Sequence, residues 1–115
     1  MKISFREESS FQKNREKLFG GDENFRLFQN ALIETPRAGD VIQGTGGARK
    51  VRWADERRGM GKRGGIRVVY LYVEAYQTIL FLAAYDKNVE DLTPAQKKEI
   101  ADATQAFKDE LQADG

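Results

Sequence analysis

Basic side chains are concentrated in one short segment in the middle of the chain. Residues 49–67 carry eight lysines and arginines against two acidic residues, whereas residues 68–115 carry four basic and nine acidic side chains. A sheet that presents cations beside aromatic rings can hold phosphates and stack unpaired bases. The segment therefore indicates a surface that binds polyanions; the alternative is a solvated strand edge whose charges discourage aggregation. Its basic residues are Arg49, Lys50, Arg52, Arg57, Arg58, Lys62, Arg63 and Arg67.

The chain has no histidine and no cysteine, which removes the usual general base, the usual metal ligands and a thiol nucleophile. Cleavage of a phosphodiester without a metal needs cations that hold the charge growing on the phosphorus oxygens, and groups that move two protons. Lys50 is a candidate base, because clustered cations favour its neutral amine; those expected to act are Arg49, Arg52 and Arg67. Tyr85 or a second lysine is then the candidate acid.

Length and total charge limit the class of protein. The 115 residues, with a mass of 13.1 kDa, predict a single domain over residues 1–115 with one core. The net charge of +1 alone predicts no nucleic-acid binding, so only the local charge is informative. The longest mostly apolar run, Ile66 to Ala84, is interrupted by Arg67, Glu74 and Gln77. We therefore expect no membrane span and a cytoplasmic location.

Two glycine motifs and one acidic cluster suggest ligand sites, but each has a simpler interpretation. Residues 59–64 fit the pattern G-x-G-x-x-G, yet a strand follows them, where a dinucleotide site needs a helix. They predict a cationic loop instead. Residues 44–47 lack the ending of a P-loop and predict a tight turn. Asp86 and the pair Glu90–Asp91 precede a helix, where acids are favoured anyway, so we expect no metal and no cofactor.

Helix signals occur near both ends of the chain. Ser9 or Ser10 is expected to cap a first helix that ends at Gly20, and Asp22 to cap a second that ends before Pro36. Their aromatic residues recur at helical spacing and are expected in the core. Residues 93–96 match a capping box that opens a C-terminal helix, with an apolar stripe of Ile100, Ala103, Phe107 and Leu111.

Strand signals occupy the rest of the sequence. Alternation predicts a short strand over residues 1–5, and residues 48–54, 66–73 and 78–85 predict an antiparallel meander. We expect Tyr70 and Tyr72 to be half-buried in this sheet. The predicted fold is an α+β domain: a small antiparallel β-sheet with the helices on one face, two of them N-terminal and one C-terminal.

Several stretches together carry a family resemblance. They are DVIQGTGGARKVR over residues 40–52, GKRGGIRVVY over residues 61–70, and YDKN followed by DLTPAQK within residues 85–97; FRLFQ at residues 25–29 extends them over most of the chain. In combination these stretches resemble the RelE/HigB superfamily of bacterial toxins, and most of all the HigB type. The resemblance implies the RelE-like microbial RNase fold.

The resemblance also implies an activity: a ribosome-dependent endoribonuclease that cleaves mRNA in the A site and so inhibits translation. In that family a ribose 2′-hydroxyl attacks the neighbouring phosphate without a metal, leaving a 2′,3′-cyclic phosphate and a 5′-hydroxyl. By position, Lys50, Arg52, Arg67, Tyr85 and Lys87 are implied as catalytic, with Arg52 and Arg67 on the scissile phosphate. The residues implied in binding RNA or the ribosome are Arg49, Arg57, Arg58, Lys62 and Arg63.

The family further implies a type II toxin–antitoxin pair. Its partner would be a helix-turn-helix antitoxin, and operator DNA would be contacted only through that antitoxin. Two alternatives remain open: a ParE-like toxin that inhibits DNA gyrase without cutting RNA, and a non-catalytic RNA-binding module.

Overall fold

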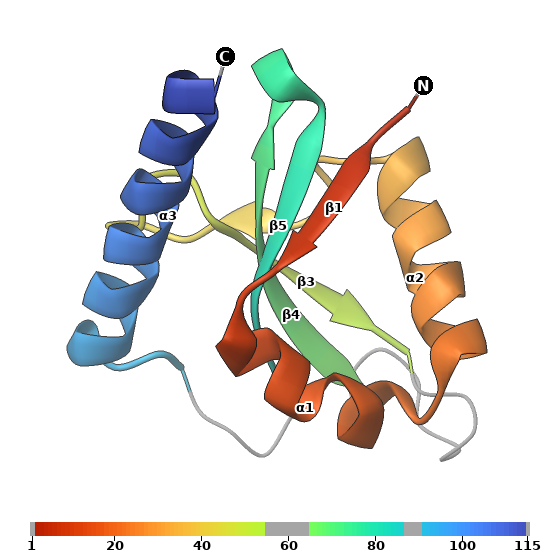
Figure 1. Cartoon of the computed structure of the whole chain (residues 1–115). Coiled ribbons are helices and arrows are strands. Elements are labelled where there is room, and N and C mark those ends of the chain that lie inside the picture. The colour runs from red at the N-terminus through yellow and green to blue at the C-terminus, as the bar shows by residue number, and fades with distance from the viewer. Residues whose placement is uncertain (1, 55–64, 87–90, 115) are drawn as a thin grey trace.

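The computed structural model describes residues 2–54, 65–86 and 91–114. The predicted strands of the meander appear within one residue of their expected bounds, whereas the first strand lies further along the chain than expected (Figure 1). The elements in chain order are β1 (Ser4–Glu7), α1 (Ser9–Phe19), α2 (Asp22–Glu34), β2 (Asp40–Val41), β3 (Arg49–Trp53), β4 (Ile66–Val73), a 3₁₀ turn (Glu74–Tyr76), β5 (Thr78–Asp86) and α3 (Pro94–Asp114).

The strands form one five-stranded sheet in the order β1-β5-β4-β3-β2. The pairs from β2 to β5 are antiparallel, as predicted, but β1 runs parallel to β5, with Ser4 opposite Thr78. The prediction of a wholly antiparallel sheet is therefore wrong at this edge. Two helices and three strands separate β1 from β5, so the connection is long enough for either direction, and alternation along β1 does not encode direction.

Helices α1 and α2 cover one face of the sheet, as predicted (Figure 1). Their aromatic residues belong to the core and contact Phe81 of β5; the stacked pair Phe11 and Phe81 has ring centroids 4.9 Å apart. Such aromatic pairs add stabilisation beyond their buried area. The helix residues in this core are Phe11, Leu18, Phe19, Phe25, Phe28 and Leu32.

Helix α3 covers the opposite face, so the prediction of all helices on one face is wrong (Figure 1). Its expected apolar stripe is present, because Ile100 and Phe107 are buried against Val69 and Leu71 of β4. The reason is that β4 is apolar on both sides: Val68 and Val69, which point to opposite faces, are both 0% exposed. Two apolar faces require a helical layer on each side.

The start of α3 confirms the predicted capping box. The Thr93 Oγ1 atom accepts a hydrogen bond of 3.1 Å from the Gln96 amide, and Gln96 Oε1 accepts one of 2.9 Å from the Thr93 amide. These bonds satisfy two amide groups that would otherwise lack partners at a helix N-terminus.

The predicted caps of the first two helices are wrong. Helix α1 begins at Ser9 with Glu8 at the capping position, and the Ser10 hydroxyl donates a hydrogen bond of 2.8 Å to the Leu82 carbonyl of β5. Asp22 is the first residue of α2 and follows a glycine at the capping position. The Gly20 end of α1 is confirmed, with φ at 73° in the left-handed region.

Residues 44–47 form the expected turn between β2 and β3. Gly44 and Gly46 have φ values of 79° and 76°, which only glycine adopts readily. The buried Thr45 hydroxyl donates 2.7 Å to the Ile42 carbonyl and accepts 3.1 Å from the Ala48 amide. The Thr45 hydroxyl thus bonds to the backbone of the turn itself, and the turn leads directly into β3.

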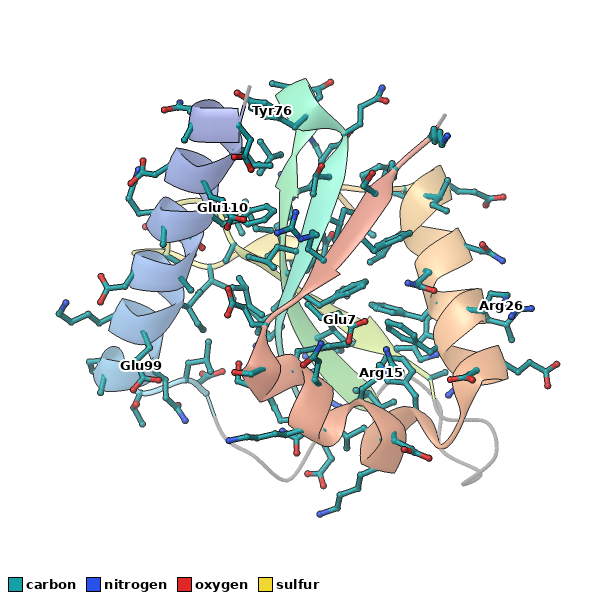
Figure 2. The ribbon with its side chains drawn as sticks, viewed as in Figure 1. Glu7, Arg15, Arg26, Tyr76, Glu99 and Glu110 are labelled. Carbon is teal, nitrogen blue, oxygen red and sulfur yellow. The ribbon has the colours of Figure 1, made fainter. Side chains whose placement is uncertain are left out.

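Ion pairs join the outer elements. Glu7 of β1 and Arg15 of α1 point toward each other in Figure 2, with a distance of 2.9 Å between Arg15 Nη1 and Glu7 Oε2. This pair is part-buried, whereas the pair of Arg6 and Glu110 is exposed, and exposed pairs stabilise a fold by about 1 kcal/mol or less. No helix in the described part of the chain is long and apolar enough to span a bilayer.

Tyr70 has a structural role in this fold. Its side chain is 0% exposed, and its hydroxyl donates 2.7 Å to the Pro36 carbonyl while accepting 3.0 Å from the Gly39 amide. Burial raises the pKa of the phenol, so it remains a neutral donor. These bonds fix the segment that leads from α2 into β2.

Tyr70→Phe is expected to lower the free energy of unfolding by about 1–3 kcal/mol, because it leaves a buried carbonyl and a buried amide without a partner. Urea denaturation followed by circular dichroism measures the change. Tyr72→Phe, at a half-buried position of the same strand, is the matched control and should change stability by less than about 0.5 kcal/mol. Equal effects of the two variants would contradict the role given to the Tyr70 hydroxyl.

Candidate functional site

Three of the predicted site residues lie side by side across three strands. Arg52 of β3 is opposite Arg67 of β4, and Arg67 is opposite Tyr85 of β5. Directly opposed residues project from the same face of a sheet, with Cβ atoms about 4.5–5.5 Å apart. Arg52, Arg67 and Tyr85 therefore form a row, here called the cationic row, on the face that α3 partly covers.

A β-bulge in β5 brings Tyr85 to this face. The pairing of β5 with β4 skips Leu82, which has no opposite residue. In an unbroken strand, Tyr85 would project to the same side as Phe81, four residues earlier. Instead Phe81 lies in the core under α1 and α2, whereas Tyr85 packs against the core under α3. Without the bulge the phenol would be on the wrong side of the sheet from Arg67.

Lys50 lies next to the row. It precedes Arg52 by two residues on β3 and so shares its face, as predicted from the alternation. Its Nζ atom is 3.6 Å from Oδ1 of Asp91, which follows β5 and precedes α3. The Lys50 side chain is 33% exposed and that of Asp91 is 95% exposed, so solvent and ligands reach this pair.

Arg49 points away from the row. Its guanidinium donates hydrogen bonds of 2.8 Å to the Gly39 carbonyl and 3.4 Å to the Arg37 carbonyl. Arg49 is paired with Tyr70, and the two lie on the face of the sheet opposite to that of Lys50. The structure therefore separates Arg49 from the three basic residues that it brings together.

The remaining predicted residues lie outside the described part of the chain. They are Arg57, Arg58, Lys62, Arg63 and Lys87. Within the described residues, Arg67 marks the strand end nearest to the segment that carries four of them, and its Nη1 atom donates 3.0 Å to the Gly65 carbonyl.

Tyr85 is placed to donate a proton. Burial raises the pKa of its phenol, and the negative charge of Asp91 raises it further, while the positive charge of Arg67 lowers it. The phenol is therefore protonated at neutral pH. A protonated phenol beside the Arg67 guanidinium can supply a hydrogen bond or a proton to an oxygen atom of a bound anion.

The row and Lys50 together suit an anion that carries charge on several oxygens. Two guanidinium groups offer forked donors, and Lys50 adds a point charge two residues along the strand. Among residues 2–54, 65–86 and 91–114, no group of three or more acidic side chains is arranged to hold a metal ion. The described side chains thus offer electrostatic stabilisation and proton transfer.

Two features of this site are not evident from the sequence. The bulge at Leu82 has no glycine or proline to signal it, and residues 79–84 of the strand are all apolar, so no alternation marks it either. Asp91 stands just before a helix, where an acid is expected for the helix dipole alone, so its contact with Lys50 depends on tertiary packing.

Comparison with solved structures identifies similar folds in several structures of one toxin. No family model matches the chain. A chain of the intact Escherichia coli RelBE toxin–antitoxin complex aligns with a TM-score of 0.55 and 17% identity, covering 78% of this chain and 100% of that chain. The isolated E. coli RelE toxin aligns with a TM-score of 0.53 and 15% identity, covering 86% of this chain and 96% of that one.

A third solved structure agrees. It is an E. coli RelE variant in the free state with two arginines replaced by alanine; it aligns with a TM-score of 0.51 and 17% identity, covering 73% of this chain and 82% of that chain. These identities are low, so the likeness concerns the arrangement of helices and strands. Despite its different sequence, the chain has the α+β fold of the RelE toxin.

Proposed function

We propose that this protein is the toxin of a type II toxin–antitoxin pair in the RelE/HigB superfamily, of the HigB type, and that it cleaves mRNA on the ribosome. The observation that carries the proposal is the cationic row of Arg52, Arg67 and Tyr85 on the open end of a RelE-like sheet. Fold alone does not specify an activity, so the argument depends on the chemistry of the row.

The opposed arginines favour an anionic ligand. Like charges directly opposite on neighbouring strands destabilise a sheet, and Arg52 stands opposite Arg67. A phosphate bound between them neutralises this repulsion and receives forked hydrogen bonds. We therefore assign Arg52 and Arg67 to phosphate binding, at a cost to the stability of the free protein.

The order of the groups along the face supports the reaction that the family resemblance implies. The ribose 2′-hydroxyl attacks the adjacent phosphorus, and Lys50 takes its proton. Arg52 and Arg67 hold the charge that develops on the non-bridging oxygens. Tyr85 gives its proton to the departing 5′-oxygen, for which its raised pKa keeps it protonated. The products are a 2′,3′-cyclic phosphate and a 5′-hydroxyl, and no metal takes part. Lys87 is the alternative acid.

The ribosome supplies what the described site lacks. The chain has no histidine, and its proton-transfer groups are weak at neutral pH. Holding the mRNA in a reactive geometry can replace several kcal/mol of barrier, so alignment in the A site compensates. In this proposal Arg49, Arg57, Arg58, Lys62 and Arg63 contact the RNA backbone or the ribosome.

An antitoxin completes the proposal. One structural neighbour is the intact RelBE toxin–antitoxin complex. This neighbour supports an antitoxin partner, and from the resemblance to the HigB type we assign this chain a helix-turn-helix antitoxin that restrains it in the cytoplasm and alone contacts operator DNA. A toxin that degrades mRNA needs such restraint in its own cell.

Arg52→Gln and Arg67→Gln are each expected to lower the rate of ribosome-dependent mRNA cleavage by about a hundredfold or more, because each removes a transition-state contact. Primer extension on mRNA after induction measures the cuts. Arg52→Gln should also raise the free energy of unfolding, by up to about 1 kcal/mol, because it removes the like-charge pair. Arg26→Ala, on the exposed side of α2 (Figure 2), is the control and should cleave like the wild type.

The same experiment separates the alternatives. Discrete ribosome-dependent cuts support the nuclease. DNA damage with intact transcripts would instead identify a ParE-like inhibitor of gyrase, and salt-dependent RNA binding without cuts would identify a binding module. Wild-type cleavage by Arg67→Gln would remove Arg67 from the mechanism.

Tyr85→Phe is expected to lower the cleavage rate by about a hundredfold while leaving the fold intact, because the ring still packs and only the proton donor is lost. Single-turnover cleavage on programmed ribosomes measures the rate, and thermal melting checks the fold. Tyr76→Phe, at an exposed position far from the row (Figure 2), is the matched control. Unchanged cleavage by Tyr85→Phe would transfer the acid role to another group.

Lys50→Arg distinguishes a base from a fixed charge. Arginine keeps the positive charge but does not give up its proton near neutral pH. If Lys50 is the base, Lys50→Arg and Lys50→Gln should both lower the single-turnover rate by about a hundredfold. Substantial activity in Lys50→Arg but not in Lys50→Gln would show that Lys50 acts by charge alone.

A further inference from the structure

A groove of about 310 Å³ lies beside the cationic row, between β2, β3 and the start of α3. Lys50 forms part of its wall, so the groove is continuous with the candidate site. Most of its other lining residues have no role in the mechanism above. The lining residues are Asp40, Val41, Ile42, Lys50, Asp91, Leu92 and Lys97.

The walls of this groove suit a flat polar ring. Val41 is 55% exposed, unusual for a large apolar side chain, while Ile42 and Leu92 are half-buried. Apolar side chains can contact the face of an unpaired base, and charged groups at the rim can bind its edge. The rim here offers two carboxylates, Asp40 and Asp91, as hydrogen-bond acceptors, and lysines as donors.

A second groove lies on the other side of the cationic row and can be compared with the first as a site for an unpaired RNA base. It measures about 380 Å³ and lies on the Tyr85 side, between α1, β5 and α3. Glu8 and Glu99 line it, and none of its lining residues within the described part of the chain is basic, so these residues disfavour a nucleic-acid backbone. The groove at Lys50 is therefore the one that suits RNA.

Distance along the strand allows the groove and the row to hold one nucleotide. Lys50 and Arg52 are two residues apart on β3, about 6–7 Å. A nucleotide whose phosphate is bound at Arg52 and Arg67 can thus place its sugar near Lys50 and its base beyond it. Because Lys50 is assigned to the attacking 2′-hydroxyl, that nucleotide is the one on the 5′ side of the cut.

We propose that the groove binds guanine in the nucleotide immediately 5′ of the cleaved bond; this proposal rests on the nuclease function proposed above. Guanine presents two adjacent donors, N1–H and the 2-amino group, which match the two oxygens of a carboxylate such as Asp40, and an O6 acceptor for Lys97. On the same edge, adenine and uracil present one donor position each. Asp40 is thus a specificity residue.

The test compares cleavage of ribosomes programmed with mRNAs that differ only in the nucleotide 5′ of the cut. The wild type should cleave after guanine at least about tenfold faster than after adenine, as one bidentate contact provides. Asp40→Asn should reduce this ratio to about threefold or less, because the amide offers a single acceptor oxygen. Asp109→Asn, at an exposed position on the far part of α3, should keep the wild-type ratio.

A binding experiment gives a readout that is independent of cleavage. In NMR titrations of the wild type, 3′-GMP should bind more tightly than 3′-AMP, and Asp40→Asn should remove the difference. Cleavage without a guanine preference, or equal binding of the two nucleotides, overturns the guanine site while the nuclease stands. Absence of cleavage by the folded wild type overturns the proposed function, and the titration then decides the guanine site by itself.

Discussion

The burial of β4 on both faces is the constraint on which the rest of the structure depends. Val68 and Val69 point in opposite directions and neither is exposed, so each face of the sheet must be covered. Helices α1 and α2 cover one face and α3 the other. Arg67 stands at the end of this strand, two residues before Val69, where the core under α3 stops. A charged residue is tolerated on the central strand at this position because its head still reaches solvent.

The site that forms at this end opposes the stability of the fold. Two arginines face each other across neighbouring strands, and a tyrosine hydroxyl is partly removed from water beside them. The buried Tyr70 hydroxyl, by contrast, makes two hydrogen bonds that stabilise the free protein. The two tyrosines thus have different roles because their surroundings differ. Tyr70 fixes the segment between α2 and β2, whereas Tyr85 lies opposite Arg67 near the end of β5.

Much of the fold was predictable because local patterns encode it. Strand and helix positions follow from alternation and capping, and the capping box at Thr93 forms as its sequence indicates. Two facts are set by tertiary contacts instead: the parallel direction of β1 and the position of α3 on the second face. The alternation on β3 was enough to place Lys50 with Arg52. The position of Tyr85 beside Arg67 was not predictable from alternation, because the bulge at Leu82 reverses the face of β5 on which Tyr85 lies.

Asp91 connects the groove to the chemistry of the row. Its carboxylate is paired with Lys50 and also raises the pKa of Tyr85. A guanine base in the groove offers hydrogen-bond donors to acceptors at this rim, and Asp91 is among them. When the proposed base shares the Asp91 charge, less of that charge acts on the Tyr85 phenol, whose pKa then falls. A lower pKa makes the phenol a better proton donor while it stays protonated at neutral pH. In the proposed mechanism, recognition of the base and proton transfer are therefore linked through one exposed carboxylate.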